Sequence, residues 1–318
     1  MARSLENPWR KLDGCRVGNS LRVDAAHPLD LFWAIGLSGA YAFVAYGIPW
    51  REGVKISSPT GVDIRFVKVN PDSGQLILTL GDNRNWEMFY TFCCDICEAT
   101  RRCSNAAFLD RALKRIENWK RFLSKKRDLM LSQQQIQGLV GELLFLRDHL
   151  ARAFSVGEAI SFWKGPHGSP QDFTVMKDAV EVKTILASAR SEVTISSFSQ
   201  LDPKSDHLYL HVCRLGESTA DSVSSFTLPR LVASILSMCA GDESAAETFE
   251  SALTELGYVA MPAYDDYVYV KVGEETYEVC DGFPCIRPCD VPPGVIEGKY
   301  RIALNWCKDF VAKPDWMK

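Results

Sequence analysis

The stretch QDFTVMKDAVEVKT, residues 171–184, decides the fold expected for this chain. Residues 173–176 and 179–186 are rich in apolar and β-branched side chains, which predicts two short strands. If Lys177 and Asp178 form a two-residue turn, the strands pair as an antiparallel hairpin. Lys-Asp is not a favoured hairpin turn, so a longer turn that shifts the register stays open.

Three charged residues of this stretch, Asp172, Glu181 and Lys183, are expected to lie together. Glu181 and Lys183 are two apart in one strand, so their side chains point to the same face. With the turn at 177–178, Asp172 lies opposite Lys183 and Thr174 lies opposite Glu181, and directly opposed residues also share a face. The hairpin thus brings two carboxylates and one ammonium to one side.

Two carboxylates beside a lysine suit phosphate chemistry. Their oxygens can hold a hard divalent cation such as Mg²⁺, for which Mn²⁺ can substitute. The cation lowers the pKa of a bound water and neutralises charge that develops on a phosphate, and a lysine can orient that water. The alternative for Glu181-Val-Lys183 is an amphipathic surface strand. An acid-x-Lys triplet arises easily by chance, and two more occur in this chain, at Asp202-Pro-Lys204 and Glu297-Gly-Lys299.

A third carboxylate comes from the helix expected over residues 132–154. Ser132 suits the N-cap position, and Gln135 completes a capping box. The apolar residues of this helix form one narrow arc: Ile136, Leu139, Leu143, Leu146 and Leu150. Glu142 lies at the edge of that arc, where burial of a carboxylate is costly unless it is paired or near a metal. Gly138 and Gly141 flank Glu142, and small residues allow another backbone to approach closely.

The helix expected over residues 106–129 is basic. Residues 101–128 hold ten Lys or Arg and three Asp or Glu, a local charge of +7. At 100° per residue, six basic side chains fall on one face of this helix: Arg111, Lys114, Arg115, Arg121, Lys125 and Lys126. Such stripes are the electrostatic footprint of nucleic-acid binding, so these residues are candidates for contacts to phosphates. The alternative is a solvated helix face.

Composition excludes several classes of protein. The chain has 318 residues and a net charge of −4, which excludes a globally basic coat protein for nucleic acid. Hydrophobic residues make up 47% of it, which excludes disorder over most of its length. Eleven cysteines without regular spacing, and no apolar stretch in the first 13 residues, predict a cytoplasmic protein with reduced thiols. Residues 31–50 are uncharged, but their Gly and Pro residues favour a strand hairpin over a membrane span.

The remaining segments alternate between strand and helix patterns. Strands are expected at 31–36, 40–46, 54–57, 62–69, 75–80, 207–214, 267–272, 276–280 and 300–306. Further helices are expected at 85–103, 228–239 and 244–256, and residues 195–201 are expected to open one. A length of 318 residues indicates about two domains.

Other groups of residues carry weaker signals. His207 and His211 share a strand face, but no carboxylate partner is evident there, so a structural role is preferred. The cysteines within residues 93–97 and 280–289 form no repeated CxxC pair, which favours buried or free thiols over zinc. No P-loop for nucleotide phosphates is present in the sequence, so ATP hydrolysis would require a partner protein.

The chain resembles the PD-(D/E)XK nuclease superfamily, and more narrowly a bacterial family of PD-(D/E)XK proteins from antiviral defence loci. The residues that carry the resemblance are 138–146 (GLVGELLFL), Trp163, Gln171-Asp-Phe173, 180–184 (VEVKT), 195–201 (ISSFSQL), 277–284 (YEVCDGFP) and 294–304. The match covers most of the chain and is strongest over residues 130–215. Gln171 stands where the superfamily name has Pro, a position that varies among its members.

The resemblance implies an α/β fold with a restriction-endonuclease-like core, a mixed central sheet flanked by helices. It places the nuclease core at residues 105–215, after a β-rich N-terminal region (1–104) and before an α+β C-terminal region (216–318).

The resemblance also implies Mg²⁺-dependent hydrolysis of phosphodiester bonds and a role for each candidate residue. Asp172 and Glu181 would be the metal ligands, and Lys183 would orient the attacking water. Glu142 would be the helix carboxylate that aids the metal or its water. Gln200 resembles the polar helix residue that follows the Glu-x-Lys strand in some members.

These features together predict a metal-dependent DNA endonuclease subunit of a bacterial restriction or antiviral system. The resemblance implies partner proteins of the same system, an ATPase or a methyltransferase, and a homodimer would supply one site for each DNA strand. The alternative is a non-catalytic subunit that binds nucleic acid or serves as a scaffold. The intact set of Asp, Glu and Lys favours the enzyme.

Overall fold

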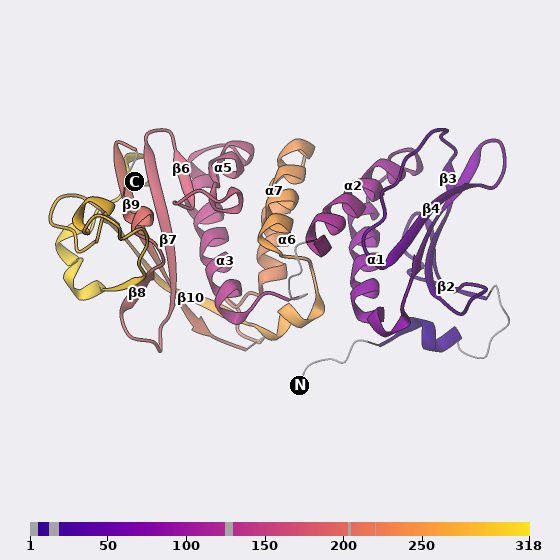
Figure 1. Ribbon diagram of the computed structural model, residues 1–318, viewed down its shortest axis with the longest axis horizontal. Coiled ribbons are helices and arrows are strands. Elements are labelled where there is room, and N and C mark those ends of the chain that lie inside the picture. The colour runs from indigo at the N-terminus through magenta and orange to yellow at the C-terminus, as the bar shows by residue number, and fades with distance from the viewer. Residues whose placement is uncertain (1–5, 13–18, 125–129, 203–204, 220) are drawn as a thin grey trace. The chain divides into compact units, whose positions relative to one another are not determined.

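The computed structural model describes residues 6–12, 19–124, 130–202, 205–219 and 221–318 (Figure 1). The chain divides between Met130 and Leu131 into two compact units. This division differs from the three regions expected from the sequence. The basic helix falls in the N-terminal unit, whereas the sequence placed it with the nuclease core at 105–215.

The N-terminal unit contains a five-stranded antiparallel sheet with the order β1-β2-β3-β5-β4. Its strands are β1 (Ser20–Arg22), β2 (Asp30–Ile35), β3 (Tyr41–Pro49), β4 (Val62–Lys68) and β5 (Ser73–Leu80). β2 and β3 form the hairpin that the sequence favoured over a membrane span. Residues 54–57, expected as a strand, are irregular.

Two helices complete this unit, α1 (Trp86–Thr100) and α2 (Asn105–Ser124). They pack against each other, and α2 also packs against β3. Their apolar faces are buried, including Phe92 of α1 and Trp119 of α2, whose rings contact each other. Among the helices that the structure describes, none combines the length and the apolar composition needed to cross a membrane.

The C-terminal unit contains a four-stranded mixed sheet with the order β10-β9-β7-β6. The strands are β6 (Phe173–Val175), β7 (Asp178–Leu186), β9 (His207–Glu217) and β10 (Tyr269–Glu278). β7 pairs antiparallel with β6 and parallel with β9, and β9 pairs antiparallel with β10. A separate two-stranded sheet consists of β8 (Glu192–Ile195) and β11 (Tyr300–Ala303).

Helices cover one side of the four-stranded sheet, and β8 lies on the other side (Figure 1). The helices are α3 (Gln133–Phe145), α4 (Ala151–Ala153), α5 (Val156–Phe162), α6 (Leu228–Met238) and α7 (Glu243–Leu256). On the other side, Ile185, Leu210 and Val212 pack with Val193 and Ile302 in one core cluster. This is the mixed sheet flanked by helices that the sequence predicted.

The predicted helix over 132–154 is confirmed at its start and changes near its end. Ser132 is the N-cap, and Gln135 completes the predicted capping box. The helix then passes through a π-helical turn, Leu146–Leu150, before it ends as α4. A π-helical turn inserts one residue into an α-helix, and such turns frequently occur at functional sites.

Four other predicted elements of the C-terminal unit are corrected. Residues 195–201 form the end of β8 and a 3₁₀ turn, Phe198–Leu201, and not a longer helix. The two strands expected at 267–272 and 276–280 are the single strand β10, because pairing with β9 continues across a bulge near Gly273. The strand expected at 300–306 ends at Ala303.

Candidate active site

The β6–β7 hairpin turns one residue earlier than the sequence suggested. Val175 pairs with Asp178, so Met176 and Lys177 form the turn, and Met176 has a φ of 53° in the left-handed region. The predicted turn at Lys177-Asp178 is therefore wrong. Continued by one residue beyond the pair of Phe173 and Val180, this register places Asp172 opposite Glu181, and not opposite Lys183. All these side chains still share one face, and the two carboxylates become direct neighbours across the hairpin.

Asp172 is fixed at the start of β6 by hydrogen bonds to the backbone. Its carbonyl oxygen accepts from the N–H groups of Lys164 at 2.7 Å and Gly165 at 3.0 Å. Its Oδ2 accepts from the N–H of Val182 at 2.8 Å. The bridge between Trp163 and Phe173 holds the same loop against β6. The loop and β7 thus hold this carboxylate from two sides.

Glu181 and Lys183 form a buried hydrogen-bonded pair on β7. Only 1% of Glu181 is exposed, and its Oε1 accepts from Lys183 Nζ at 2.5 Å. The other oxygen, Oε2, is buried and has no hydrogen-bond partner among the described residues. Lys183 also donates to Gln200 Oε1 at 3.3 Å, and that oxygen accepts from the N–H of Ser196 at 2.7 Å. Gln200 therefore helps to orient the lysine, although it lies on a 3₁₀ turn.

Glu142 reaches the site from α3 because this helix packs closely on β7. A Cβ atom on Gly141 would lie 1.9 Å from Thr184 Oγ1, so the close approach requires glycine there. Nothing lies within 4 Å of the corresponding point on Gly138, so the predicted role of that residue in close packing is not seen. Glu142 Oε2 accepts from the indole N–H of Trp163 at 2.7 Å.

Glu142 and Asp172 face the same small volume beside Gly165. A Cβ atom on Gly165 would lie 3.2 Å from Asp172 Oδ1 and 3.3 Å from Glu142 Oε2. Glu142, Asp172 and Lys183 are half-buried, and Glu181 is buried. The structure therefore brings together all five residues that the sequence assigned to this site: Glu142, Asp172, Glu181, Lys183 and Gln200.

Burial raises the pKa of each carboxyl group in the site. The pKa of Glu142 lies well above its usual range because of burial and the nearby Asp172, and burial also raises the pKa of Asp172. Burial, with Asp172 nearby, raises the pKa of Glu181 to about 8. Burial alone would lower the pKa of Lys183, but the carboxylates of Glu181 and Asp172 raise it. Three carboxylates beside one ammonium leave an excess of negative charge when ionised.

This donor set fits a divalent cation that prefers oxygen ligands. A cation would offset the excess negative charge, and it would give the buried Oε2 of Glu181 the partner that it lacks among the described groups. Asp172 and Glu181 would be its ligands, with Glu142 beside them. The residues present are therefore suited to Mg²⁺ or Mn²⁺.

The sequence did not assign roles to three further residues of the site. Trp163 donates to Glu142, and Gly165 leaves space between two carboxylates. Gln171 Nε2 donates to the carbonyl oxygens of Ser199 at 2.8 Å and Gln200 at 3.3 Å, so it ties the start of β6 to the turn that carries Gln200. No local pattern signals these contacts, because each joins segments that are distant in the sequence.

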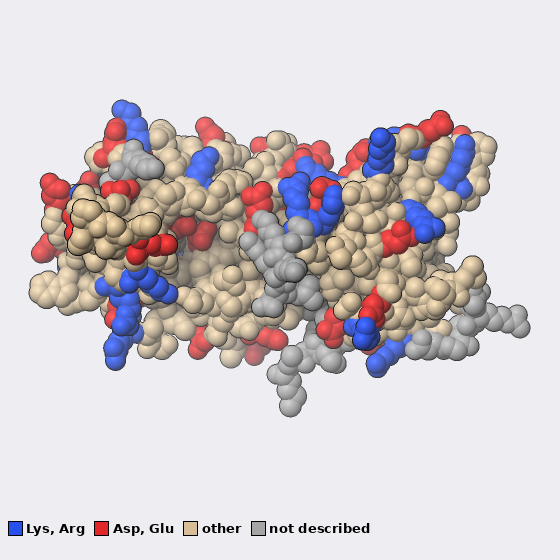
Figure 2. Space-filling view, viewed as in Figure 1, with Lys and Arg blue, Asp and Glu red and all other residues tan. Residues whose placement is uncertain are grey.

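The predicted basic residues lie in the other unit, on α2. Lys114 and Arg121 are exposed and Arg111 is half-buried, whereas Lys125 and Lys126 lie outside the described residues. Figure 2 shows Lys and Arg side chains next to Asp and Glu side chains on the visible face.

Arg115 differs from the other basic residues of α2. It donates to Asp95 through Nε at 2.8 Å and Nη2 at 2.5 Å, and only 12% of its side chain is exposed. The indole N–H of Trp119 donates to the same carboxylate at 2.9 Å. Arg115 therefore holds α2 to α1, and its guanidinium does not lie on an exposed basic face.

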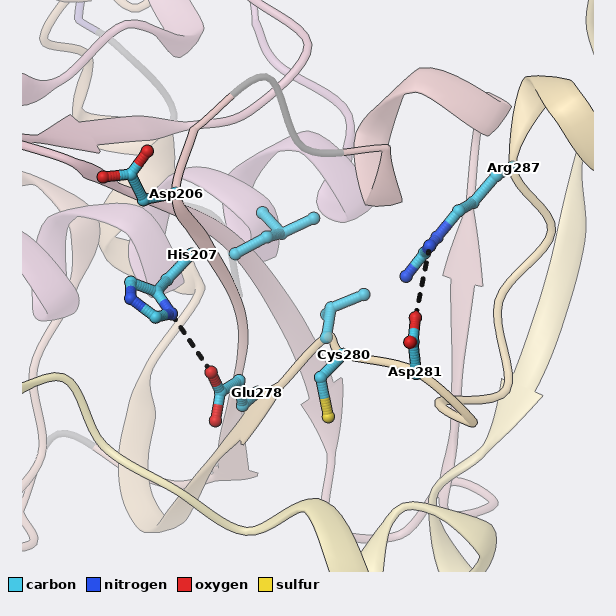
Figure 3. A pocket seen from close by; sticks show the side chains of 8 residues that line it. Asp206, His207, Glu278, Cys280, Asp281 and Arg287 are labelled. Atoms are coloured by element: carbon cyan, nitrogen blue, oxygen red, sulfur yellow. Dashed lines mark hydrogen bonds and ion pairs between the residues drawn. The ribbon is translucent and has the colours of Figure 1, made fainter.

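A cavity of about 480 Å³ lies at the place where β9 begins and β10 ends (Figure 3). Its polar lining residues are Asp206, His207, Glu278, Cys280, Asp281 and Arg287. The polar groups pair with each other, since His207 Nδ1 lies 3.2 Å from Glu278 Oε1 and Arg287 Nη1 lies 3.9 Å from Asp281 Oδ1. The active-site carboxylates do not line this cavity, so it is separate from the site described above.

Comparison with known proteins gives one match. The family model described as "Putative PD-(D/E)XK family member, (DUF4420)" matches residues 5–305. No curated protein and no solved structure matches the chain. The matched range contains the whole active site and both sheets of the C-terminal unit. Because the match spans nearly the full length, this chain belongs to that PD-(D/E)XK family, and its mixed α/β fold is of the restriction-endonuclease type.

Proposed function

We propose that this protein is a metal-dependent endonuclease subunit that hydrolyses DNA phosphodiester bonds in a bacterial restriction or antiviral system. One observation carries the proposal. Glu142, Asp172 and Glu181 meet Lys183 in a partly buried site, on a chain from a nuclease-like family. Charged groups that are buried at this cost point to a chemical use.

Each side chain has a role that its contacts support. When bound, Mg²⁺ would supply Lewis-acid chemistry at a phosphate oxygen and at a bound water. Asp172 and Glu181 would hold the cation, while Glu142 keeps a carboxylate beside Asp172. The ammonium of Lys183, which Gln200 orients, can place a water or offset charge on a phosphate oxygen.

Binding of DNA requires positive charge that the site itself does not supply. The exposed Lys114 and Arg121 of α2 are proposed as phosphate contacts. The net charge of −4 predicts weak nonspecific affinity for the whole chain. A partner protein of the same system, an ATPase or a methyltransferase, or a second copy of this chain would therefore add affinity.

The test is a plasmid-nicking assay with Mg²⁺ or Mn²⁺, with and without candidate partner proteins. Asp172→Asn and Lys183→Met are expected to reduce nicking by roughly 100-fold or more, because each removes a group at the reacting centre. Glu297→Gln and Lys299→Met are matched controls, since this exposed triplet has the same spacing outside the site.

Two outcomes would count against the proposal. Equal nicking by wild type and all four variants would show that another site or a contaminant cleaves the plasmid. Metal binding at the carboxylates without cleavage in any partner context would favour a scaffold subunit that has kept the fold.

A further inference from the structure

A second cluster of metal-ligating side chains lies away from the active-site carboxylates. His149 stands in the π-helical turn that follows α3, His211 lies on β9 and Glu274 lies on β10. One ligand atom from each of the three lies within 4.8 Å of the other two. From the sequence alone, a structural role is preferred for His211 because no carboxylate partner is evident on its strand face. The pairing of β9 with β10 supplies that partner.

Two of the three distances between the ligand atoms are close to those of a tetrahedral metal site. Glu274 Oε2 lies 3.0 Å from His149 Nε2 and 3.5 Å from His211 Nε2. A zinc ion about 2.1 Å from each ligand keeps tetrahedral ligand pairs roughly 3.4 Å apart. Small side-chain movements are therefore enough for the three groups to share one ion.

The surroundings orient the two imidazole rings. His211 is 1% exposed, and its Nδ1 hydrogen-bonds to Thr276 Oγ1 at 2.9 Å, so its Nε2 points toward Glu274. The ring of Phe145 contacts both imidazoles, with centroids 4.8 Å from His211 and 5.4 Å from His149. A hydrogen bond from an oxygen group to the nitrogen that does not bind the metal is typical of ligating histidines.

The cluster already accommodates a positive charge. Lys271 Nζ lies 2.8 Å from Glu274 Oε2 and 2.9 Å from Asp148 Oδ2, and Asp148 also accepts from Arg147 at 2.8 Å. A quarter of the Lys271 side chain is exposed, so its flexible chain can turn toward solvent. Asp148 would then keep its ion pair with Arg147, whereas Glu274 would lose the ammonium group, which favours uptake of another cation by Glu274.

We propose that His149, His211 and Glu274 bind a divalent transition-metal ion such as Zn²⁺, in exchange for the ammonium of Lys271. Imidazole ligands select zinc over magnesium, so this site differs in chemistry from the oxygen-only site of Asp172 and Glu181. The ion would tie the helix that carries Glu142 to two strands of the sheet. It would therefore stabilise the C-terminal unit without entering the active site.

The test is Zn²⁺ binding by the full chain in a variant whose active-site ligands are removed, Asp172→Asn with Glu181→Gln. Competition with a chromogenic chelator gives the affinity, and absorption of bound Co²⁺ reports the ligand geometry. We expect one equivalent of Zn²⁺. His149→Ala and His211→Ala should each weaken binding by roughly 100-fold or more. Lys271→Met should tighten it, because no ammonium then competes for Glu274.

His207→Ala is the matched control, because His207 also pairs with a glutamate, at 3.2 Å, but lies on the exposed surface. Absence of Zn²⁺ binding, or equal losses in His207→Ala and His149→Ala, would overturn the proposal. If His211→Ala does not fold, His149→Ala, whose position is partly exposed, serves as the test variant. The second measurement is then the shift of the unfolding temperature that Zn²⁺ causes with and without His149→Ala. Failure here leaves the nuclease proposal untouched, since the binding variant has no active-site carboxylate pair.

Discussion

Glu181 shows at the residue scale how burial and charge shape the site. One oxygen is paired with Lys183, and the other has no partner in the part of the chain that the structure describes. Burial raises its pKa to about 8, so without a metal it holds a proton at neutral pH. A cation must displace that proton, which couples metal binding to pH.

Mn²⁺ affinity is therefore expected to rise with pH up to about pH 8 and then to level off. Calorimetric titrations in two buffers of different ionisation enthalpy should show proton release on binding at pH 7. The slope of log affinity against pH is expected to be at least one below pH 8, because Glu181 releases one proton and the other carboxyl groups of the site also have raised pKa values. An affinity that is flat between pH 6 and 8 would contradict the assignment of Glu181 as a metal ligand.

The same proton predicts the pH dependence of stability in the metal-free protein. The folded state binds this proton more tightly than the unfolded state, whose carboxyl group has a pKa near 4.5. The free energy of unfolding therefore falls as the pH rises from about 4.5 to about 8. Glu181→Gln should flatten this dependence in urea titrations. A variant that keeps the wild-type slope would place the proton on another group.

Arg115 and Lys114 are neighbours on α2 with different expected roles. Arg115→Ala leaves the carboxylate of Asp95 buried without its cation, which is expected to lower the free energy of unfolding by about 3 kcal/mol. Lys114→Ala changes an exposed side chain, and about 0.5 kcal/mol or less is expected. Urea unfolding of the full chain measures both. Equal small losses would return Arg115 to the candidates for phosphate contacts.

At the scale of elements, the contact between α3 and β7 decides whether the site forms. The two elements approach so closely at Gly141 that a Cβ would overlap Thr184 Oγ1, whereas Gly138 on the same helix has open space. Glu142 follows Gly141 directly, so the close approach places this carboxylate beside Asp172. Thr184 Oγ1 is buried without a hydrogen-bond partner among the described atoms, so Thr184 acts at this contact through its packing against α3.

Gly141→Ala is expected to destabilise the protein by about 1–3 kcal/mol or more, because the added methyl group overpacks the helix–strand contact. Gly138→Ala is the matched control, and it is expected to stabilise by about 0.5–1 kcal/mol because alanine favours the helix. Thr184→Ala should rescue part of the loss in Gly141→Ala, since it removes the clashing oxygen. Thermal unfolding of the wild type, the two glycine variants and the Gly141→Ala, Thr184→Ala double variant measures these effects. Equal effects of the two glycine substitutions would contradict the steric explanation.

At the scale of the whole molecule, the chain consists of two units with separate sheets and separate cores. Every residue assigned to the active site lies between residues 131 and 318, and the basic helix lies before residue 131. Catalytic chemistry and the proposed phosphate contacts are therefore assigned to different units. The family model matches both units, so the two belong together in one protein.

A fragment of residues 131–318 is expected to unfold cooperatively and to bind Mn²⁺ within about threefold of the full-chain affinity, because this unit is compact by itself and holds every residue of the candidate site. Its affinity for DNA is expected to fall, since α2 is removed. Circular dichroism, Mn²⁺ titration and filter binding measure the three properties. A soluble, folded fragment that has lost Mn²⁺ binding would show that the N-terminal unit completes the site.

The sequence by itself determined most of the local elements and the members of the candidate active site. Gly and Pro residues predicted the β2–β3 hairpin, and capping residues predicted the start of α3 at Ser132, because these signals act between residues close in the chain. The strand period of two placed Glu181 and Lys183 on one face whatever the register. The candidate residues Glu142, Asp172 and Gln200 also joined that site in the structure.

Only the tertiary structure decided which distant segments meet. It moved the hairpin turn to Met176 and Lys177. It also brought the indole N–H of Trp163 to Glu142 as a hydrogen-bond donor, and it paired Arg115 with Asp95. It also brought Glu274 to His211 by joining two expected strands into β10. These contacts follow from side-chain packing and strand pairing between segments far apart in the sequence. Local patterns do not report contacts between distant segments. The sequence therefore named the residues of the candidate active site but not their neighbours.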